Sequence, residues 1–240
     1  MLLKTIATGS SGNCHALIAD TGEILLLDLG ESEKKIKKGI GWRISDIVGA
    51  IVTHKHADHS KSVNDFERMG VPVLKPYENA SDIGLKNISG FKVQAFDLTT
   101  IDGRWTHTDA DGEPCACYGF LIEHKEMGRM LYITDTAIVK WRFKNINHIL
   151  LGVNYDKDMI YPDNDGKKNH IFGGHLEIGT ACDFVRANNS DSLQNVIMCH
   201  LSADNADSDK FIERMKKACP AANVYVAGRN DGWWLSDGKV

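Results

Sequence analysis

The feature that most constrains this chain is a hexapeptide rich in metal-binding side chains. Residues 54–59 read His-Lys-His-Ala-Asp-His, which places three imidazoles and one carboxylate within six positions. Imidazole nitrogen and carboxylate oxygen are natural zinc ligands, and such a mixed set also admits manganese or iron. The alternative is a solvated polar turn whose histidines are incidental. With ten histidines in 240 residues, three in one hexapeptide rarely coincide by chance, so we predict metal ligands at His54, His56, Asp58 and His59.

Length and composition are those of an ordinary globular chain. The 240 residues suffice for a sizeable core, and we expect a single domain over residues 1–240. The hydrophobic fraction of 42% and the charged fraction of 25% are typical of such domains. A net charge of −4 is too mild to indicate extended electrostatic wrapping of nucleic acid, although it is compatible with a local basic patch.

Cysteine usage and the first residues favour a cytoplasmic protein. Six cysteines in a chain of this length are too sparse for a disulfide framework, so we expect reduced thiols. Cys115 and Cys117 are spaced wrongly for a zinc knuckle. The first residues lack the apolar region and cleavage site of a signal peptide. No run of eighteen apolar residues predicts a membrane span.

Short apolar runs alternate with helical patterns along the chain. Helices are expected at 61–69, 177–187 and 207–218, where apolar residues recur at helical spacing. This mixture predicts an α/β sandwich rather than an all-β or all-helical fold. Runs rich in Val, Ile and Leu predict buried strands at 2–7, 15–19, 24–28, 50–53, 71–74, 92–96, 118–123, 130–134, 149–153, 196–199 and 223–226.

Four acidic or imidazole residues directly follow predicted strands. Asp28 follows an Ile-Leu-Leu-Leu run, and His54, Asp135 and His200 each follow another apolar run. Functional side chains often lie on loops at strand ends, where a rigid sheet positions them. Because four separate strands repeat the pattern, we expect these residues to converge. Taken singly, Asp135 could be a turn residue and His200 a buried structural histidine.

The hexapeptide resembles the HxHxDH signature of the metallo-β-lactamase superfamily. The order of Asp28, the hexapeptide, a middle histidine, Asp135 and His200 also fits that family, and the resemblance covers most of the chain. Within the family the chain is similar to the YycJ/WalJ-type branch, near nucleases of the RNase J and tRNase Z kind. The strings that indicate this branch are shorter, namely residues 8–13, 134–136, 174–176 and 199–202.

This resemblance implies a fold and a ligand set. The fold would be an αββα sandwich of two mixed β-sheets flanked by helices, with two divalent metal ions, Zn or Mn, at one edge. A hydroxide bridging the two ions would attack the substrate, and Asp58 would face it. Asp28 would orient a ligand imidazole from behind. The implied ligands are His54, His56 and His107 for the first metal, Asp58, His59 and His200 for the second, and Asp135 between them.

The middle histidine is the least certain of these ligands. His107 lies in a polar loop, and a surface histidine is the alternative interpretation. The family pattern places the middle histidine more directly after a strand, as His124 is placed, although His124 could be a simple edge residue. His148 and His170 have no motif around them, and we interpret both as structural.

Three further segments are candidates for substrate contact. His175 precedes a predicted helix, and in related nucleases a histidine in this context lies beside the metals. It would protonate the leaving group or hold a phosphate oxygen; a surface position is the alternative. Ser11 and Asn13 lie in a small-residue loop that would bind substrate, or form a plain tight turn. The lysines of residues 34–38 would contact a nucleic-acid backbone, although a solvated helix face is favoured.

The leading hypothesis is therefore a metal-dependent hydrolase, a phosphodiesterase or exonuclease acting on DNA or RNA. A second hypothesis keeps the same site for a small molecule, such as a cyclic nucleotide, thioester or lactone, which the mild net charge favours. A third is an accessory nucleic-acid-binding protein with a degenerate site, which the full ligand set opposes. The sequence leaves open the substrate, endo or exo cleavage, and whether the chain forms a homodimer.

Overall fold

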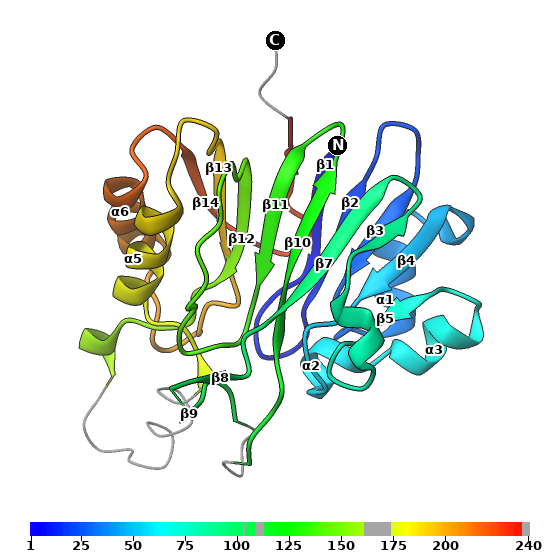
Figure 1. Cartoon of the computed structure of the whole chain (residues 1–240), viewed down its shortest axis with the longest axis horizontal. Coiled ribbons are helices and arrows are strands. Elements are labelled where there is room, and N and C mark those ends of the chain that lie inside the picture. Colours follow the sequence, from blue (N-terminus) through cyan, green and yellow to red (C-terminus); the bar gives the residue numbers. More distant parts are fainter. Residues whose placement is uncertain (103, 109–112, 161–173, 237–240) are drawn as a thin grey trace.

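Two β-sheets pack face to face, and helices cover their outer faces (Figure 1). The computed structural model describes residues 1–102, 104–108, 113–160 and 174–236. A separate small hairpin is formed by β8 (Thr100–Ile101) and β9 (Arg104–Trp105). Each large sheet contains both parallel and antiparallel pairs, so the structure confirms the predicted αββα sandwich of two mixed sheets.

The first sheet has six strands in the order β15-β1-β2-β3-β4-β5. Antiparallel pairing joins β15, β1, β2 and β3, and parallel pairing joins β3, β4 and β5. The four residues of β3 are all buried, as expected for a strand covered on both faces. The bounds are β1 Leu2–Ala7, β2 Cys14–Ile18, β3 Ile24–Leu27, β4 Ile47–Ile51, β5 Val73–Leu74 and β15 Gly232–Trp234.

The second sheet has seven strands in the order β14-β13-β12-β11-β10-β7-β6. The strands from β11 to β14 are parallel, whereas β10, β7 and β6 add antiparallel pairs. Strand β7 alternates buried and exposed residues, the pattern of a strand with one covered face. The bounds are β6 Lys86–Ile88, β7 Phe91–Asp97, β10 Tyr118–His124, β11 Gly128–Ile133, β12 His148–Gly152, β13 Asn195–Cys199 and β14 Asn223–Val226.

Helices α5 (Ile178–Asn188) and α6 (Ser208–Ala218) cover the second sheet. Each is preceded by an acidic capping residue, Glu177 or Asp207, whose side chain accepts a hydrogen bond from a first-turn backbone N–H. The remaining helices are short: α1 Glu33–Gly39, α2 Ala57–Ser60 and α3 Val63–Arg68, with 3-10 turns η1 Ile44–Asp46, η2 Ala80–Ile83 and η3 Lys157–Met159. Among the described helices, none has the length and apolar character to cross a membrane.

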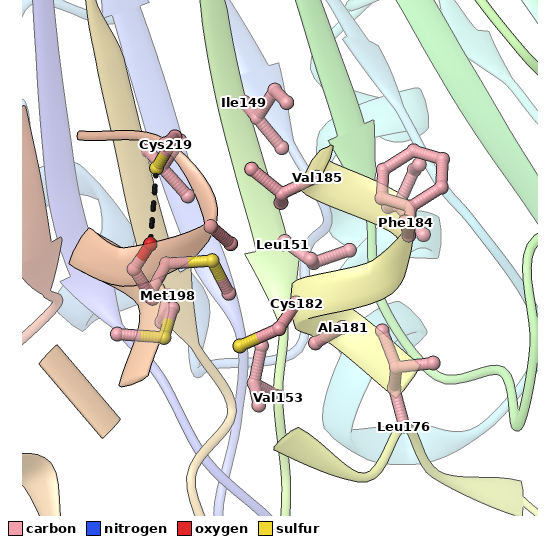
Figure 2. Close-up of a cluster of buried hydrophobic side chains, with 14 of the residues drawn as sticks. Ile149, Leu151, Val153, Leu176, Ala181, Cys182, Phe184, Val185, Met198 and Cys219 are labelled. Atoms are coloured by element: carbon pink, nitrogen blue, oxygen red, sulfur yellow. Dashed lines mark hydrogen bonds between the residues drawn. The ribbon is translucent and has the colours of Figure 1, made fainter. Parts of the chain in front are cut away.

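Three layers of buried side chains hold the sandwich together. The central layer lies between the two sheets and includes Leu25, Phe120 and Tyr132. An outer layer joins the second sheet to α5 and α6, where Figure 2 shows Leu151 of β12 facing Val185 of α5. The other outer layer packs the first sheet against α1 and α3. Burial of apolar surface on both faces of each sheet fixes the strand ends from which the polar loops project.

The structure contains every strand and helix region that the apolar pattern predicts, with shifted ends. The expected helix at 61–69 is α3, and the short α2, which was not predicted, precedes it inside and just after the hexapeptide. Strands β6, β8, β9 and β15 were not predicted, because segments of two or three residues are too short to show a period. The lysine run lies on α1, where Lys35 and Lys37 form ion pairs with acidic neighbours, as a solvated helix face does.

Candidate metal centre

The polar residues that follow strands converge at one edge of the sandwich. Asp28 follows β3 and His54 lies three residues after β4, and these strands are parallel neighbours. Asp135 lies two residues after β11, and His200 directly follows β13 in the same parallel array. Carboxyl ends of parallel strands meet at one edge of a sheet. The two sheets therefore bring all four residues together, as expected.

The hexapeptide folds as a short loop that enters α2. His54 and His56 lie before the helix, with His56 at the position that precedes its first residue, while Asp58 and His59 lie on its first turn. The loop after β3 packs so closely beneath this turn that a Cβ atom on Gly30 would lie 1.6 Å from the Asp58 carbonyl oxygen. Only glycine fits there, so α2 can pack directly against the loop at the end of the first sheet.

Three histidines form a first set of ligand atoms. One nitrogen from each of His54, His56 and His107 lies within 4.8 Å of the others. His107 Nε2 lies 2.9 Å from His56 Nδ1, and His107 Nδ1 lies 2.8 Å from the Gly174 carbonyl oxygen. A carbonyl accepts only, so Nδ1 of His107 carries the proton and Nε2 keeps a lone pair for a cation. The structure therefore places His107 beside the hexapeptide and not on the surface.

A second set combines two carboxylates with two histidines. Ligand atoms of Asp58, His59, Asp135 and His200 all lie within 4.8 Å of one another. Asp135 is central, because its Oδ2 lies 3.2 Å from His59 Nε2 and its Oδ1 lies 3.5 Å from His200 Nε2. The same Oδ2 lies 3.7 Å from Nε2 of His54, in the first set. Asp135 thus stands between the two sets, in the geometry of a shared ligand.

Asp28 is a buried acceptor behind the second set. Its carboxylate accepts hydrogen bonds from the backbone N–H of Thr53 at 2.8 Å, the Tyr132 hydroxyl at 2.6 Å and His59 Nδ1 at 2.6 Å. A proton held on Nδ1 leaves Nε2 of His59 directed toward Asp135, where a cation would bind. Asp28 and His200 both have positive φ, a costly conformation for non-glycine residues that occurs at sites held by their surroundings.

Burial and neighbouring charge divide the histidines into two electrostatic classes. Burial lowers the pKa of His107 to about 4 and places that of His54 well below its ordinary value. Burial also opposes the charged form of His59, but the carboxylates of Asp28 and Asp135 outweigh it and raise its pKa well above normal. The pKa of Asp135 is lowered, because His200 and His59 outweigh its burial. Neutral imidazoles and ionised carboxylates are the forms that bind metal.

These donors fit divalent cations. The Nε2 atom of His54 is buried and has no hydrogen-bond partner within the described part of the chain. An imidazole nitrogen buried without a partner is costly, and a cation at this point would satisfy it. Nitrogen and oxygen donors in this ratio suit zinc or manganese, and none of the ligand atoms is the soft sulfur that would favour other metals.

The remaining candidate residues occupy different positions. His175 lies beside both ligand sets, with Nδ1 3.7 Å from Asp135 Oδ1 and its ring stacked on His200, and its side chain is only 12% exposed. Asn13 is buried, and its Nδ2 atom lies 3.1 Å from His59 Nε2. Ser11 is exposed on the turn that precedes it. Asn13 therefore lies against the ring nitrogen of His59 that faces Asp135, whereas Ser11 is open to solvent.

His148 and His124 belong to neither ligand set. His148 is buried in β12 and bonds to the Ser236 carbonyl oxygen and the Asn195 side chain, so it is structural as predicted. His124 ends β10 and packs on the Phe91 ring. His170 lies outside the residues that the structure describes.

Sequence reasoning missed three residues that support the ligands. The Thr53 hydroxyl lies within hydrogen-bond distance of Asp28 and His54, Tyr132 donates to Asp28, and Asn154 Nδ2 lies 3.2 Å from His200 Nδ1. Thr53 directly precedes the hexapeptide, so its position in the sequence already indicated that it lies near the site. Tyr132 is an ordinary member of an apolar strand, so only the packing of the two sheets reveals its role.

A two-sheet sandwich with this histidine and aspartate cluster at one edge defines a metal-dependent hydrolase. The family comparison agrees over more than half of the chain, since the model of the metallo-beta-lactamase superfamily matches residues 7–137. The chain therefore belongs to the metallo-beta-lactamase superfamily.

One curated relative and two solved structures are similar to this chain. The exodeoxyribonuclease YycJ of Bacillus anthracis is 27% identical over 219 residues, which cover 84% of this chain and 83% of that protein. A diphosphatase of the PhnP family superposes with a TM-score of 0.64 at 12% identity, covering 97% of this chain and 96% of that one. The short form of human tRNase Z gives a TM-score of 0.57 at 14% identity, with coverages of 97% and 98%. The two structural likenesses support the fold.

Proposed function

We propose that this protein is a metal-dependent phosphodiesterase that acts as an exonuclease on DNA or RNA. The observation that carries the proposal is the contact between the two ligand sets, which Asp135 joins at 3.2 Å from His59 and 3.7 Å from His54. Two adjacent cations form a clamp suited to a phosphodiester, whose attacking and leaving oxygens both need stabilisation. Similarity to an exodeoxyribonuclease over most of the chain supports the same substrate class.

The proposed ligand roles follow the two sets. His54, His56 and His107 would hold the first ion, and Asp58, His59 and His200 the second, with Asp135 shared. Divalent ions bound in this way activate water and stabilise charge that develops on a phosphoryl oxygen. Zinc or manganese suits the donors, and two ions per chain is part of the proposal.

The protein's own residues would complete the reaction in two ways. Asp58 is the more exposed of the two carboxylates in the second set, at 24% against 4% for Asp135, so it would face the attacking water as well as bind metal. His175 lies at the rim with a partly exposed side chain, where it can give a proton to the leaving alkoxide. Asp28 would hold His59 in register. Ser11 would contact the substrate, whereas Asn13, also expected to do so, is buried against His59.

Compartment and assembly are further parts of the proposal. All six cysteines are buried thiols, which supports a reducing cytoplasmic environment. We also propose that residues 1–240 form one domain, because the hydrophobic layer between the sheets is continuous from strand to strand. Association into a homodimer stays a prediction that a mass measurement in solution would test.

A panel assay tests the proposed function. Metal-loaded protein is offered single- and double-stranded DNA and RNA, bis(p-nitrophenyl) phosphate, a cyclic nucleotide, a thioester and a lactone. We expect cleavage of the polynucleotides and of the simple diester, with mononucleotides released from an end. The Asp58→Ala variant, checked for folding by circular dichroism, should lose this activity and so excludes a contaminating nuclease. Hydrolysis of the thioester or lactone alone would overturn the proposal in favour of the small-molecule alternative.

A further inference from the structure

Two exposed tryptophans flank one short segment near the metal centre. Trp105 on β9 is 46% exposed and Trp141 is 42% exposed. Trp105 pairs across the hairpin with Thr100, and Trp141 donates its indole N–H to the Asp97 carbonyl oxygen at 2.6 Å. Both tryptophans therefore border residues 97–101, Trp105 through its backbone and Trp141 through its indole, although they are 36 positions apart in the sequence.

The segment that carries Trp141 is held in place on both sides. Lys140 donates to the Thr100 carbonyl oxygen at 3.0 Å, and Phe143 packs its ring on Phe96, with its backbone N–H donating to Asn188. Lys140 Nζ also lies 5.3 Å from the centre of the Trp141 ring. An aromatic side chain fixed through its edge presents a ring to a ligand with little loss of conformational entropy.

The same two segments are locally cationic in an acidic protein. Residues 97–105 and 138–144 carry four cationic side chains, Arg104, Lys140, Arg142 and Lys144, against two acidic ones, Asp97 and Asp102, whereas the whole chain has a net charge of −4. All four cationic side chains are exposed. Lys140 lies 3.7 Å from Asp97, so Arg104 and Arg142 are the better placed to meet an anionic ligand.

These tryptophans are tied to the metal centre through the backbone. Trp105 precedes His107 by two residues. Trp141 follows Asp135 by six residues, and Ala137 lies between them. The Ala137 backbone N–H donates to the Thr106 carbonyl oxygen at 2.8 Å, which joins the two routes one residue from His107. A shallow groove of about 350 Å³, lined by Trp141, Arg142 and Phe184, continues from the same segment toward α5.

We propose that Trp105 and Trp141, with Arg104 and Arg142, form a platform that binds single-stranded nucleic acid next to the metal centre; this inference rests on the proposed phosphodiesterase function. Nucleobases stack on exposed indoles, and arginines neutralise the phosphates between them. The bases of a duplex are already stacked and paired, so the platform selects an unpaired strand. It would hold the strand beyond the nucleotide being cleaved, which explains why aromatic and cationic side chains occur together here.

Binding to a labelled single strand tests the platform directly. The probe is a fluorescein-labelled, cleavage-resistant phosphorothioate oligothymidylate of about 12 nucleotides, within the usual site size of such surfaces. Fluorescence anisotropy is measured with metal-loaded wild type, Trp105→Ala and Trp141→Ala. Each variant should bind roughly 5- to 150-fold more weakly, which corresponds to the loss of one base–aromatic stack. Trp105→Phe and Trp141→Phe keep a stacking ring and should recover most of the affinity.

Matched controls separate stacking from general damage. Trp234 is 74% exposed and pairs with Leu2, at the opposite end of the first sheet from Asp28, so Trp234→Ala should bind as the wild type does. Arg142→Ala should weaken binding and reduce the salt dependence, lowering the slope of log K against log salt by about 0.7 for one lost phosphate contact. Circular dichroism and thermal melting of each variant confirm that it is folded.

The outcomes test binding by the platform separately from the proposed phosphodiesterase function. Binding of the folded Trp105→Ala and Trp141→Ala variants within twofold of the wild type overturns the platform. An equal loss of affinity for duplex DNA, or an equal loss in Trp234→Ala, also overturns it. Wild-type hydrolysis of bis(p-nitrophenyl) phosphate is measured in parallel, because that small diester reports on the metal centre alone. If the wild type cleaves the diester but the variants bind the strand as the wild type does, the proposed function stands and the platform is contradicted.

Discussion

The Asp28 carboxylate lies 2.6 Å from Nδ1 of His59, although the two residues are 31 positions apart. Both side chains are completely buried. Asp28 leaves the end of β3 and His59 lies on α2, so the contact depends on the packing of α2 against the loop after that strand. It fixes which ring nitrogen of His59 carries a proton and which is directed toward the other candidate ligands.

Replacing Asp28 by Asn should weaken metal binding without removing a ligand. The amide keeps the size of the side chain but loses the charge that orients and polarises His59, a change that commonly costs 10–100-fold in metal affinity. Competition with a chromogenic chelator measures the affinity. Tyr132→Phe is the matched control, because it removes only the hydroxyl that donates to Asp28 and should have a smaller effect. Unchanged affinity in Asp28→Asn would contradict the proposed orienting role.

Metal content should distinguish the two ligand sets. Elemental analysis of protein purified without chelator should find about two divalent ions per chain, since the two sets are adjacent and share Asp135. His107→Ala should lower this to about one ion, because the second set does not include His107. A count of zero that does not rise on adding metal would contradict the whole metal assignment, whereas two ions in His107→Ala would remove His107 from the ligands.

Metal binding near neutral pH should release protons. Burial opposes the charged form of His59, but Asp28 and Asp135 outweigh burial and raise the pKa, which favours a protonated imidazole in the metal-free protein. A cation at Nε2 displaces that proton, and affinity therefore falls as pH drops below this pKa, by about tenfold per unit for one proton. Calorimetric titration with zinc in two buffers of different ionisation enthalpy counts the protons. Release of none at pH 7 would show that His59 does not bind through Nε2.

The role of His175 should be visible in the choice of leaving group. If His175 protonates the departing alkoxide, His175→Ala should keep its metal and lose roughly 10²–10⁴-fold in rate on a natural phosphodiester. The loss should be far smaller on bis(p-nitrophenyl) phosphate, whose p-nitrophenolate departs without a proton. An equal loss on both substrates would indicate phosphate positioning. Loss of metal from the variant would make His175 a ligand.

The sequence alone indicated a metal-dependent hydrolase and the class of its fold. Apolar runs predicted the buried strands, and the hexapeptide at 54–59 predicted the metal site, because ligand chemistry and strand burial are encoded locally. Asp28, Asp135 and His200 could be selected for the same reason, since each follows a strand and strand ends share an edge.

Tertiary structure decided the contacts between residues that are distant in the sequence and lack a local motif. His107 lies in an irregular loop, and only the approach of Gly174 and His56 brings it to the first ligand set. Tyr132 belongs to an apolar strand, and it reaches Asp28 because the two sheets face each other. Trp105 and Trp141 become neighbours of one segment through hairpin pairing and an indole-to-carbonyl hydrogen bond. Such contacts depend on how whole sheets and loops pack, which no local pattern specifies.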